Sequence, residues 1–354
     1  MLNAPARLLP CNARKDQCLQ FQLKFLPPVF GLEFCTGLLG NAFALWMMVT
    51  RERRDWHSGV VFSCNLAISD LLYIFTLPML LIYYMRNKDW TFGTAACKTE
   101  RFLFTCNLYG SIFFITCISL NRYLGIVHPF FAHRHVRPHH AKVTSLLAWV
   151  VVALMSCPVL RFAHTCKKFN TTECVSYCFV EDQRAHFTYS IFLAVFGGLL
   201  PFVVTLVSYG AIMWVVWRNQ NITALEKRKV ALLVVSVLLL YAVSVIPYHI
   251  FRNWHLHQRM HDINVTKVWV YKAYQVTKGL VTLSMCIHPI LYMAVFDSIR
   301  TACCGSTAGS RQIWPTACNP QRPKHRQLQE QSELYLCFYP VELQFKIFVW
   351  HTAV

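Results

Sequence analysis

The residues with the clearest capacity for chemistry are basic and polar side chains at helical spacing. His249 and Arg252 stand three residues apart in the run Pro-Tyr-His-Ile-Phe-Arg. Gln275 and Lys278 repeat that spacing, and Arg101 adds a third cation near the start of another apolar stretch. Residues three apart share one helix face, so these groups would converge in one cavity of a helical bundle. Such a cluster repels itself unless neighbouring acids or an anionic ligand neutralise it. Phosphate suits Arg because several charge-assisted bonds form at once.

Long apolar stretches must position these residues. There are seven, near 28–50, 58–84, 97–121, 142–160, 187–216, 230–250 and 270–294. Each can cross a hydrocarbon core of about 30 Å at about 1.5 Å per residue. With 55% hydrophobic and only 14% charged residues, the sequence excludes a soluble globular protein. It predicts an all-α membrane protein with a seven-transmembrane helix bundle over 28–294, in contact with the lipid bilayer.

The distribution of charge bears on orientation and ligand. The net charge is +18, but it lies in loops and helix ends, so no nucleic-acid partner is predicted. If the N-terminus is outside, half of the 34 Lys and Arg residues lie on each side, and the positive-inside rule cannot orient the chain. Outer cysteines and the sequons at Asn170 and Asn264 place the N-terminus outside. Single basic residues snorkel to headgroups, but their coincidence on three helices favours an anionic extracellular ligand.

Each stretch also carries a motif, in a fixed order. These are Gly40-Asn41, Asn65-Leu-Ala-Ile-Ser-Asp70, Asn121-Arg122-Tyr123, Trp149, Pro201 with Tyr209, Pro247, and His288-Pro289-Ile-Leu-Tyr292. The chain thereby resembles a rhodopsin-like G-protein-coupled receptor over residues 25–300. The resemblance implies a non-enzymatic plasma-membrane receptor whose partners are a heterotrimeric G protein, arrestin and receptor kinases. It assigns G-protein activation to a set of six residues: Asn121, Arg122, Tyr123, Tyr209, Pro289 and Tyr292.

Two positions depart from the receptor pattern. Asn121 stands where the family has Asp, so the resting restraint on Arg122 is expected to be looser. His288 stands where the family has Asn or Asp. The resemblance groups it with a carboxylate inside the second span, Asp70, and with Asn107, Ser111 and Ser284, in a pocket that binds sodium in many relatives. His288 would either replace the cation as imidazolium or stay neutral as a hydrogen-bond partner.

The His-x-x-Arg and Gln-x-x-Lys patterns narrow the resemblance. Together with the runs 100–108 and 117–131 they are similar to metabotropic purinergic nucleotide receptors, most of all the ATP-preferring subtype. This implies that Arg101, Arg252 and Lys278 bind the phosphate chain, with His249 and Gln275 assisting. Lys278 replaces the usual Arg and gives up bidentate geometry. The resemblance implies signalling through phospholipase C and calcium, with adenylyl cyclase as a further output.

The resemblance also implies covalent features. Cys97 is expected to pair with Cys174 or Cys178, and the distance from Cys174 to Pro201 fits the family better. Residues 1–27 form the predicted extracellular N-terminus, with glycosylation expected at Asn170 and Asn264 in outer loops. Residues 295–354 form a predicted cytoplasmic tail, first a short amphipathic helix and then a disordered segment. Cys303-Cys304 suit S-palmitoylation.

Three other functions would leave different marks on the sequence. A receptor for small dicarboxylates would also have a basic pocket. An ion or solute transporter would show an internal repeat or broken spans with midplane charges, and the sequence contains no repeat. An enzyme would need a nucleophile–base pair, a metal cluster or a phosphate loop, none of which appears. The sequence therefore favours a receptor for extracellular nucleotides without a cofactor, apart from a sodium ion in its core.

Overall fold

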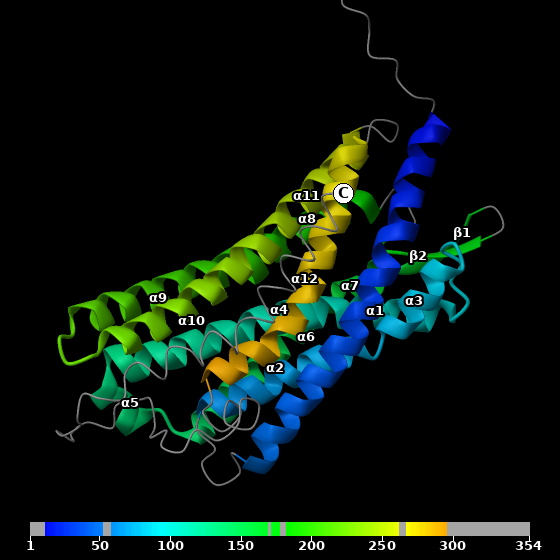
Figure 1. Cartoon of the computed structure of the whole chain (residues 1–354). Helices are drawn as coiled ribbons and strands as arrows, with labels where there is room; N and C mark the ends of the chain where they lie inside the picture. Colours follow the sequence, from blue (N-terminus) through cyan, green and yellow to red (C-terminus); the bar gives the residue numbers. More distant parts are fainter. Residues whose placement is uncertain (1–10, 52–57, 169–170, 178–181, 262–266, 296–354) are drawn as a thin grey trace, which may run out of the picture. The chain divides into compact units, whose positions relative to one another are not determined.

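The computed structural model describes residues 11–51, 58–168, 171–177, 182–261 and 267–295, which form a bundle of helices (Figure 1). The helices at the start of the chain are α1 (Cys11–Arg51), α2 (Ser58–Ile74), α3 (Leu77–Met85), α4 (Gly93–Val127), α5 (Pro129–His135), α6 (Pro138–Ser156) and α7 (Pro158–Phe162). A hairpin of β1 (His164–Lys168) and β2 (Thr171–Val175) follows. The remaining helices are α8 (Asp182–Phe192), η1 (Leu193–Leu199), α9 (Leu200–Arg218), α10 (Ala224–Leu240), η2 (Tyr241–Val245), α11 (Ile246–His261) and α12 (Val268–Val295).

All seven predicted spans are helical. Six helical stretches among the described residues are long and apolar enough to cross a membrane: 16–50, 58–85, 93–127, 138–162, 183–218 and 224–260. The 28-residue helix α12 takes the place of the seventh span and packs on α1 and α11. The predicted seven-helix bundle is confirmed.

The first helix begins well before the predicted span. The apolar stretch starts at residue 28, whereas α1 begins at Cys11 and contains Pro27 and Pro28. Hydropathy indicates where contact with lipid begins. A helix can extend beyond that point when its side chains still pack against other parts of the protein. Leu26 and Phe30 are buried on either side of the two prolines, so tertiary contacts hold the helix together there.

Prolines set the breaks within four spans. Pro78 and Pro158 stand at the first turns of α3 and α7, which restart the helices after α2 and α6. Before Pro201 and Pro247 the helix widens into the π-helical segments η1 and η2. Proline lacks a backbone N–H and its ring clashes with the preceding turn, so the helix breaks or widens on its N-terminal side.

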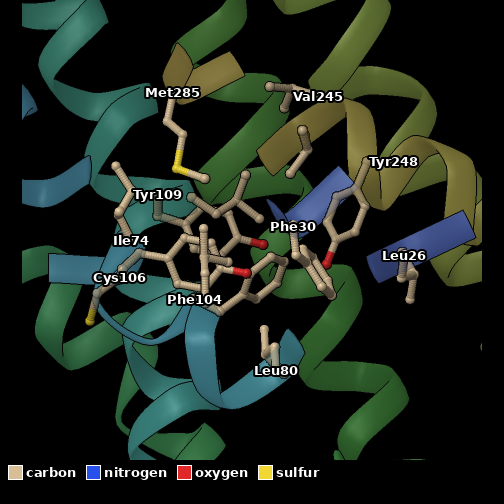
Figure 2. Packing of buried hydrophobic residues seen from close by; sticks show 14 of the residues in the cluster. Leu26, Phe30, Ile74, Leu80, Phe104, Cys106, Tyr109, Val245, Tyr248 and Met285 are labelled. Atoms are coloured by element: carbon tan, nitrogen blue, oxygen red, sulfur yellow. The ribbon is translucent and has the colours of Figure 1, made fainter. Parts of the chain in front are cut away.

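The core gathers around α4, which packs against α2, α6 and α9. Its buried Phe104 and Tyr109 meet Tyr248 from α11, Phe30 from α1 and Met285 from α12 in one hydrophobic cluster. Figure 2 shows these side chains turned toward one another. Because lipid tails are as apolar as leucine, burying apolar side chains between helices gains little hydrophobic free energy. Close packing such as this, together with interhelical hydrogen bonds, holds membrane helices together instead.

Several motif residues clamp helices together. The Asn41 amide donates to the carbonyl of Met285 at 3.0 Å, which joins α1 to α12. Gly40 faces Pro289, and a Cβ on this glycine would lie 2.9 Å from the proline Cγ. The Trp149 indole donates to the side-chain oxygen of Asn65 at 2.8 Å and joins α6 to α2. The motif residues of four spans are therefore explained by contacts between helices.

Candidate functional site

A disulfide fixes the hairpin to the bundle. Cys97 near the start of α4 is bonded to Cys174 in β2, 77 residues away, which settles the alternative with Cys178. The backbone N–H of Trp90 donates to the Thr172 carbonyl at 2.7 Å and holds the hairpin from the other side. We call the part of the bundle beside this disulfide the disulfide end. Cys166 in β1 is also disulfide-bonded, whereas Cys18 in α1 is free.

Arg101 lies one turn after Cys97 and points toward the hairpin. One guanidinium N–H donates to the Cys174 carbonyl at 3.1 Å. The Nε atom lies 3.3 Å from the carboxylate of Glu100, and the Arg101 side chain is only 14% exposed. The disulfide, the hairpin and a neighbouring acid therefore orient this arginine.

Arg252 and Lys278 lie over two aromatic rings in contact with each other. The Arg252 guanidinium carbon is 5.8 Å from the centroid of Tyr248, and the Lys278 ammonium is 5.2 Å from the centroid of Phe104. The two rings meet edge to face at 6.3 Å. Aromatic faces attract cations, so α4 and α11 together supply a platform that brings the basic groups of α11 and α12 close together. Lys278 interacts electrostatically with both Arg252 and Arg101.

His249 and Gln275 are buried at the same end. His249 stacks on Tyr109 at 5.9 Å and meets Tyr248 at 5.3 Å. Neither ring nitrogen of His249 has a hydrogen-bond partner among the described residues. Gln275 is 4% exposed, three residues before Lys278 on α12. A buried polar group without a partner is costly, so the ring nitrogens of His249 are available for a further hydrogen bond.

The structure thus brings the five predicted ligand residues to one end of the bundle, on α4, α11 and α12. We call this set the cationic site: Arg101, His249, Arg252, Gln275 and Lys278. Its aromatic platform, Phe104 and Tyr248, was not predicted. Aromatic residues occur in every span of this chain, so their spacing alone did not indicate which of them lie beside the basic residues.

Two buried acids complete the cationic site. Glu100 in α4 and Glu33 in α1 are both 0% exposed. Neither acid was among the predicted ligand residues. Glu33 could have been identified from the sequence, because an acid within a membrane span is functional by default. Even with both acids ionised, three cations leave this part of the bundle with a positive balance, which suits a ligand with several anionic oxygens.

The polar core lies deeper in the bundle, around Asp70 in α2. The His288 Nδ1 atom is 2.7 Å from one carboxylate oxygen. The other oxygen accepts from the Asn107 amide at 2.8 Å and the Ser111 hydroxyl at 3.2 Å. Ser284 donates to the Val281 carbonyl at 2.7 Å. The histidine on α12 therefore contacts one oxygen of Asp70, and two side chains of α4 contact the other.

At the opposite end of the bundle, Arg122 and Tyr209 line a small cavity of about 30 Å³ between α2, α4, α9, α10 and α12. The Tyr123 hydroxyl lies 3.1 Å from the His128 ring. Asn121 precedes Arg122 on α4, so position 121 supplies no carboxylate to the arginine. The side chain of Tyr292 lies outside the described residues.

The predicted modification sites also lie outside the described residues. They are Asn170, Asn264, Cys303 and Cys304. Their glycosylation and palmitoylation stay predictions.

Comparisons with known proteins agree with this geometry. Residues 40–292 match the family of 7 transmembrane receptors (rhodopsin family). The chain is 42% identical to purinoceptor 11 of Homo sapiens over 346 residues, which cover 90% of this chain and 91% of the relative. It is 39% identical to purinoceptor 1 of Gallus gallus over 286 residues, covering 79% and 78% of the two chains. It is 38% identical to purinoceptor 1 of Homo sapiens over 286 residues, covering 79% and 76%.

Proposed function

Because this chain belongs to the purinoceptors of the rhodopsin family of seven-transmembrane receptors, we propose that it binds an extracellular nucleotide, ATP, at the cationic site. It is a multi-pass membrane receptor and not an enzyme. The observation that supports ATP is the placement of Arg252 and Lys278 over the ring pair of Phe104 and Tyr248, with Arg101 in electrostatic interaction with Lys278. Three cations, of which Lys278 is buried and the two arginines are partly buried, suit a phosphate chain better than a single carboxylate.

Each residue has a proposed role in binding. Arg101 and Arg252 form charge-assisted bonds to phosphate oxygens, and Lys278 acts as a point charge. His249 donates one ring N–H, which has no protein partner among the described residues. Gln275 supplies an amide for a phosphate or sugar oxygen. The N-terminus and the disulfide end lie outside the cell in this proposal, so the ligand enters from the extracellular side.

Signalling follows from the helices that carry these residues. Phosphate would draw α11 and α12 toward α4 at the disulfide end. Pro247 stands just after the π-helical segment η2, where the helix can bend, so α10 would swing away from Arg122 at the opposite end. The heterotrimeric G protein would bind there and couple the receptor to phospholipase C and calcium, with adenylyl cyclase as a second output. Arrestin and receptor kinases would then act on the active receptor.

The proposal is tested in a cell line without endogenous nucleotide receptors. Calcium and cyclic AMP are recorded while ATP, UTP, ADP and succinate are added to cells with measured surface receptor. We expect a response to nucleotides, with ATP the most potent. A response to succinate without one to nucleotides would establish the dicarboxylate alternative.

We expect the Asn121→Asp variant to show less signalling without ligand, by about fivefold. The new carboxylate would pair with Arg122 and stabilise the resting conformation, because an ion pair is strong where water is excluded. Cyclic AMP and inositol phosphate accumulation per surface receptor would be compared with the wild type. Asn121→Gln, which adds no charge, is the matched control and should not lower the signal. Equal ligand-free signalling in the Asp variant would contradict the proposed loose restraint.

We further propose that His288 takes the place of sodium beside Asp70. One carboxylate oxygen is held by His288 and the other by Asn107 and Ser111, so the residues present do not fit an additional cation. We expect ATP affinity to change less than about twofold when sodium is replaced by N-methyl-D-glucamine. His288→Asn should make the affinity sodium-dependent. A clear sodium effect on the wild type would overturn this assignment.

A further inference from the structure

The most informative unassigned group is the carboxyl of Glu33, in the middle of α1. It is 0% exposed. The Thr282 hydroxyl on α12 donates to its Oε1 atom at 2.6 Å, whereas its Oε2 atom is buried with no hydrogen-bond partner among the described residues. A carboxylate in a membrane helix is expensive unless a cation stabilises it. One hydroxyl does not account for an acid at this position, because a neutral glutamine would accept that bond equally well.

The charge facing Glu33 is Lys278. Lys278 lies one turn before Thr282 on α12, and its carbonyl also accepts from the Thr282 hydroxyl at 3.2 Å. Glu33 and Lys278 interact electrostatically with each other. Lys278 is 5% exposed, so water screens this attraction poorly. The carboxyl of α1 and the amine of α12 are therefore linked through Thr282, and they interact with each other in a buried part of the bundle.

The other charged groups around Lys278 come from α4 and α11. Arg101 and Arg252 repel it and Glu100 attracts it. Glu100 lies 3.3 Å from Arg101, so that acid is already engaged with the arginine. Tyr73 on α2 also interacts electrostatically with Glu33. Both buried acids attract Lys278, Glu100 more strongly than Glu33, but among the described residues only Glu100 lies in a printed contact with an arginine.

We propose that Glu33 is the counter-ion of Lys278 in the ligand-free receptor and sets its affinity for nucleotide phosphate. Phosphate oxygens must compete with Glu33 for the ammonium, so the acid lowers affinity. When phosphate takes Lys278, the link between α1 and α12 weakens, and α1 thereby responds to occupancy of the cationic site. This inference rests on the proposed nucleotide function and adds a specificity-determining residue outside the five predicted ones.

The test is a double-mutant cycle in the full-length receptor. Binding of radiolabelled ATP to membranes would be measured for the wild type, Glu33→Gln, Lys278→Met and the double variant. Gln keeps the bond from Thr282 and removes only the charge. We expect the Glu33→Gln receptor to bind ATP about tenfold more tightly than the wild type. In the Lys278→Met background, the same substitution should change ATP affinity very little. Unchanged or weaker binding in Glu33→Gln, or an equal effect in both backgrounds, would overturn the proposal.

Two control variants separate this account from simpler ones. Glu173→Gln removes another acid at the disulfide end, one that pairs with Lys88 at 3.4 Å. If general electrostatics were the cause, it would tighten binding as much as Glu33→Gln, and we expect a much smaller effect. Thr282→Val removes the hydrogen bond to Glu33 but keeps the charge. It should not tighten binding, and a gain equal to that of Glu33→Gln would contradict the counter-ion role.

The thermal stability of the ligand-free receptor provides a second readout. We expect Lys278→Met to lower the unfolding temperature less in the Glu33→Gln background than in the wild type, because the charge partner is already gone. Additive shifts would overturn the pairing whether or not nucleotide binds. The shifts could be non-additive, which would support the pairing of Glu33 with Lys278, while the wild type binds no nucleotide. In that case the proposed ligand is wrong, and so is the proposed effect of Glu33 on phosphate affinity. If the wild type binds ATP but the shifts are additive, only the inference about Glu33 fails.

Discussion

The Arg252→Ala variant is expected to need about a hundredfold more ATP than the wild type for a half-maximal calcium response. Two charge-assisted hydrogen bonds to phosphate contribute about 1.5 kcal/mol each at the lower end, and about 1.4 kcal/mol corresponds to a factor of ten. The guanidinium also lies 5.8 Å from the Tyr248 ring, so it is oriented before the ligand arrives. Concentration–response curves at matched surface expression would measure the shift.

Arg259→Ala is the matched control for this prediction. Arg259 is on the same helix, two turns closer to its end, and its guanidinium lies 5.2 Å from the Tyr177 ring instead. Its removal should change the potency of ATP less than about threefold, since charges outside the cationic site act through solvent. Equal losses in the two variants would show that Arg252 has no special role in binding.

The second large effect is expected from Cys174→Ser. Loss of a disulfide that closes a 77-residue separation should lower the free energy of unfolding by about 4 kcal/mol. The hairpin would also release Arg101, whose guanidinium donates to the Cys174 carbonyl. Surface receptor should fall severely, and the molecules that reach the surface should respond weakly to ATP. Surface labelling with an antibody to an N-terminal tag, together with calcium recording, would measure both losses.

Cys18→Ser serves as the control for loss of a thiol. Cys18 is free and lies in α1 near the same end of the bundle. We expect normal surface expression and normal potency. If Cys174→Ser behaves like this control, neither the disulfide nor the hairpin supports the cationic site.

The spans and their order were predictable from the sequence, because the thickness of a bilayer fixes the length of an apolar helix. The start of α1 was not predictable from the sequence. Its first residues lie beyond the apolar stretch, and only contacts made by residues such as Leu26 show that the helix continues. The π-helical segments before Pro201 and Pro247 were likewise not visible, since a proline can break, kink or widen a helix.

The candidate site was predictable where spacing carried information. The two three-residue spacings of α11 and α12 put His249 with Arg252 and Gln275 with Lys278 at one end of the bundle, as expected. Glu33 was missed because its importance lies in a neighbour 245 positions away in the sequence, Lys278. The preference for Cys174 over Cys178 came from the resemblance and not from local spacing, and the disulfide to Cys97 confirms it.

The central claim is that the cationic site binds a nucleotide, and saturation binding of radiolabelled ATP tests it most directly. Membranes from cells with verified surface receptor would be compared with membranes carrying Arg252→Ala. The account predicts saturable binding that unlabelled ATP displaces, that succinate does not displace, and that the variant largely loses. Absence of saturable binding to well-expressed wild-type receptor, or binding that Arg252→Ala leaves intact, would contradict it.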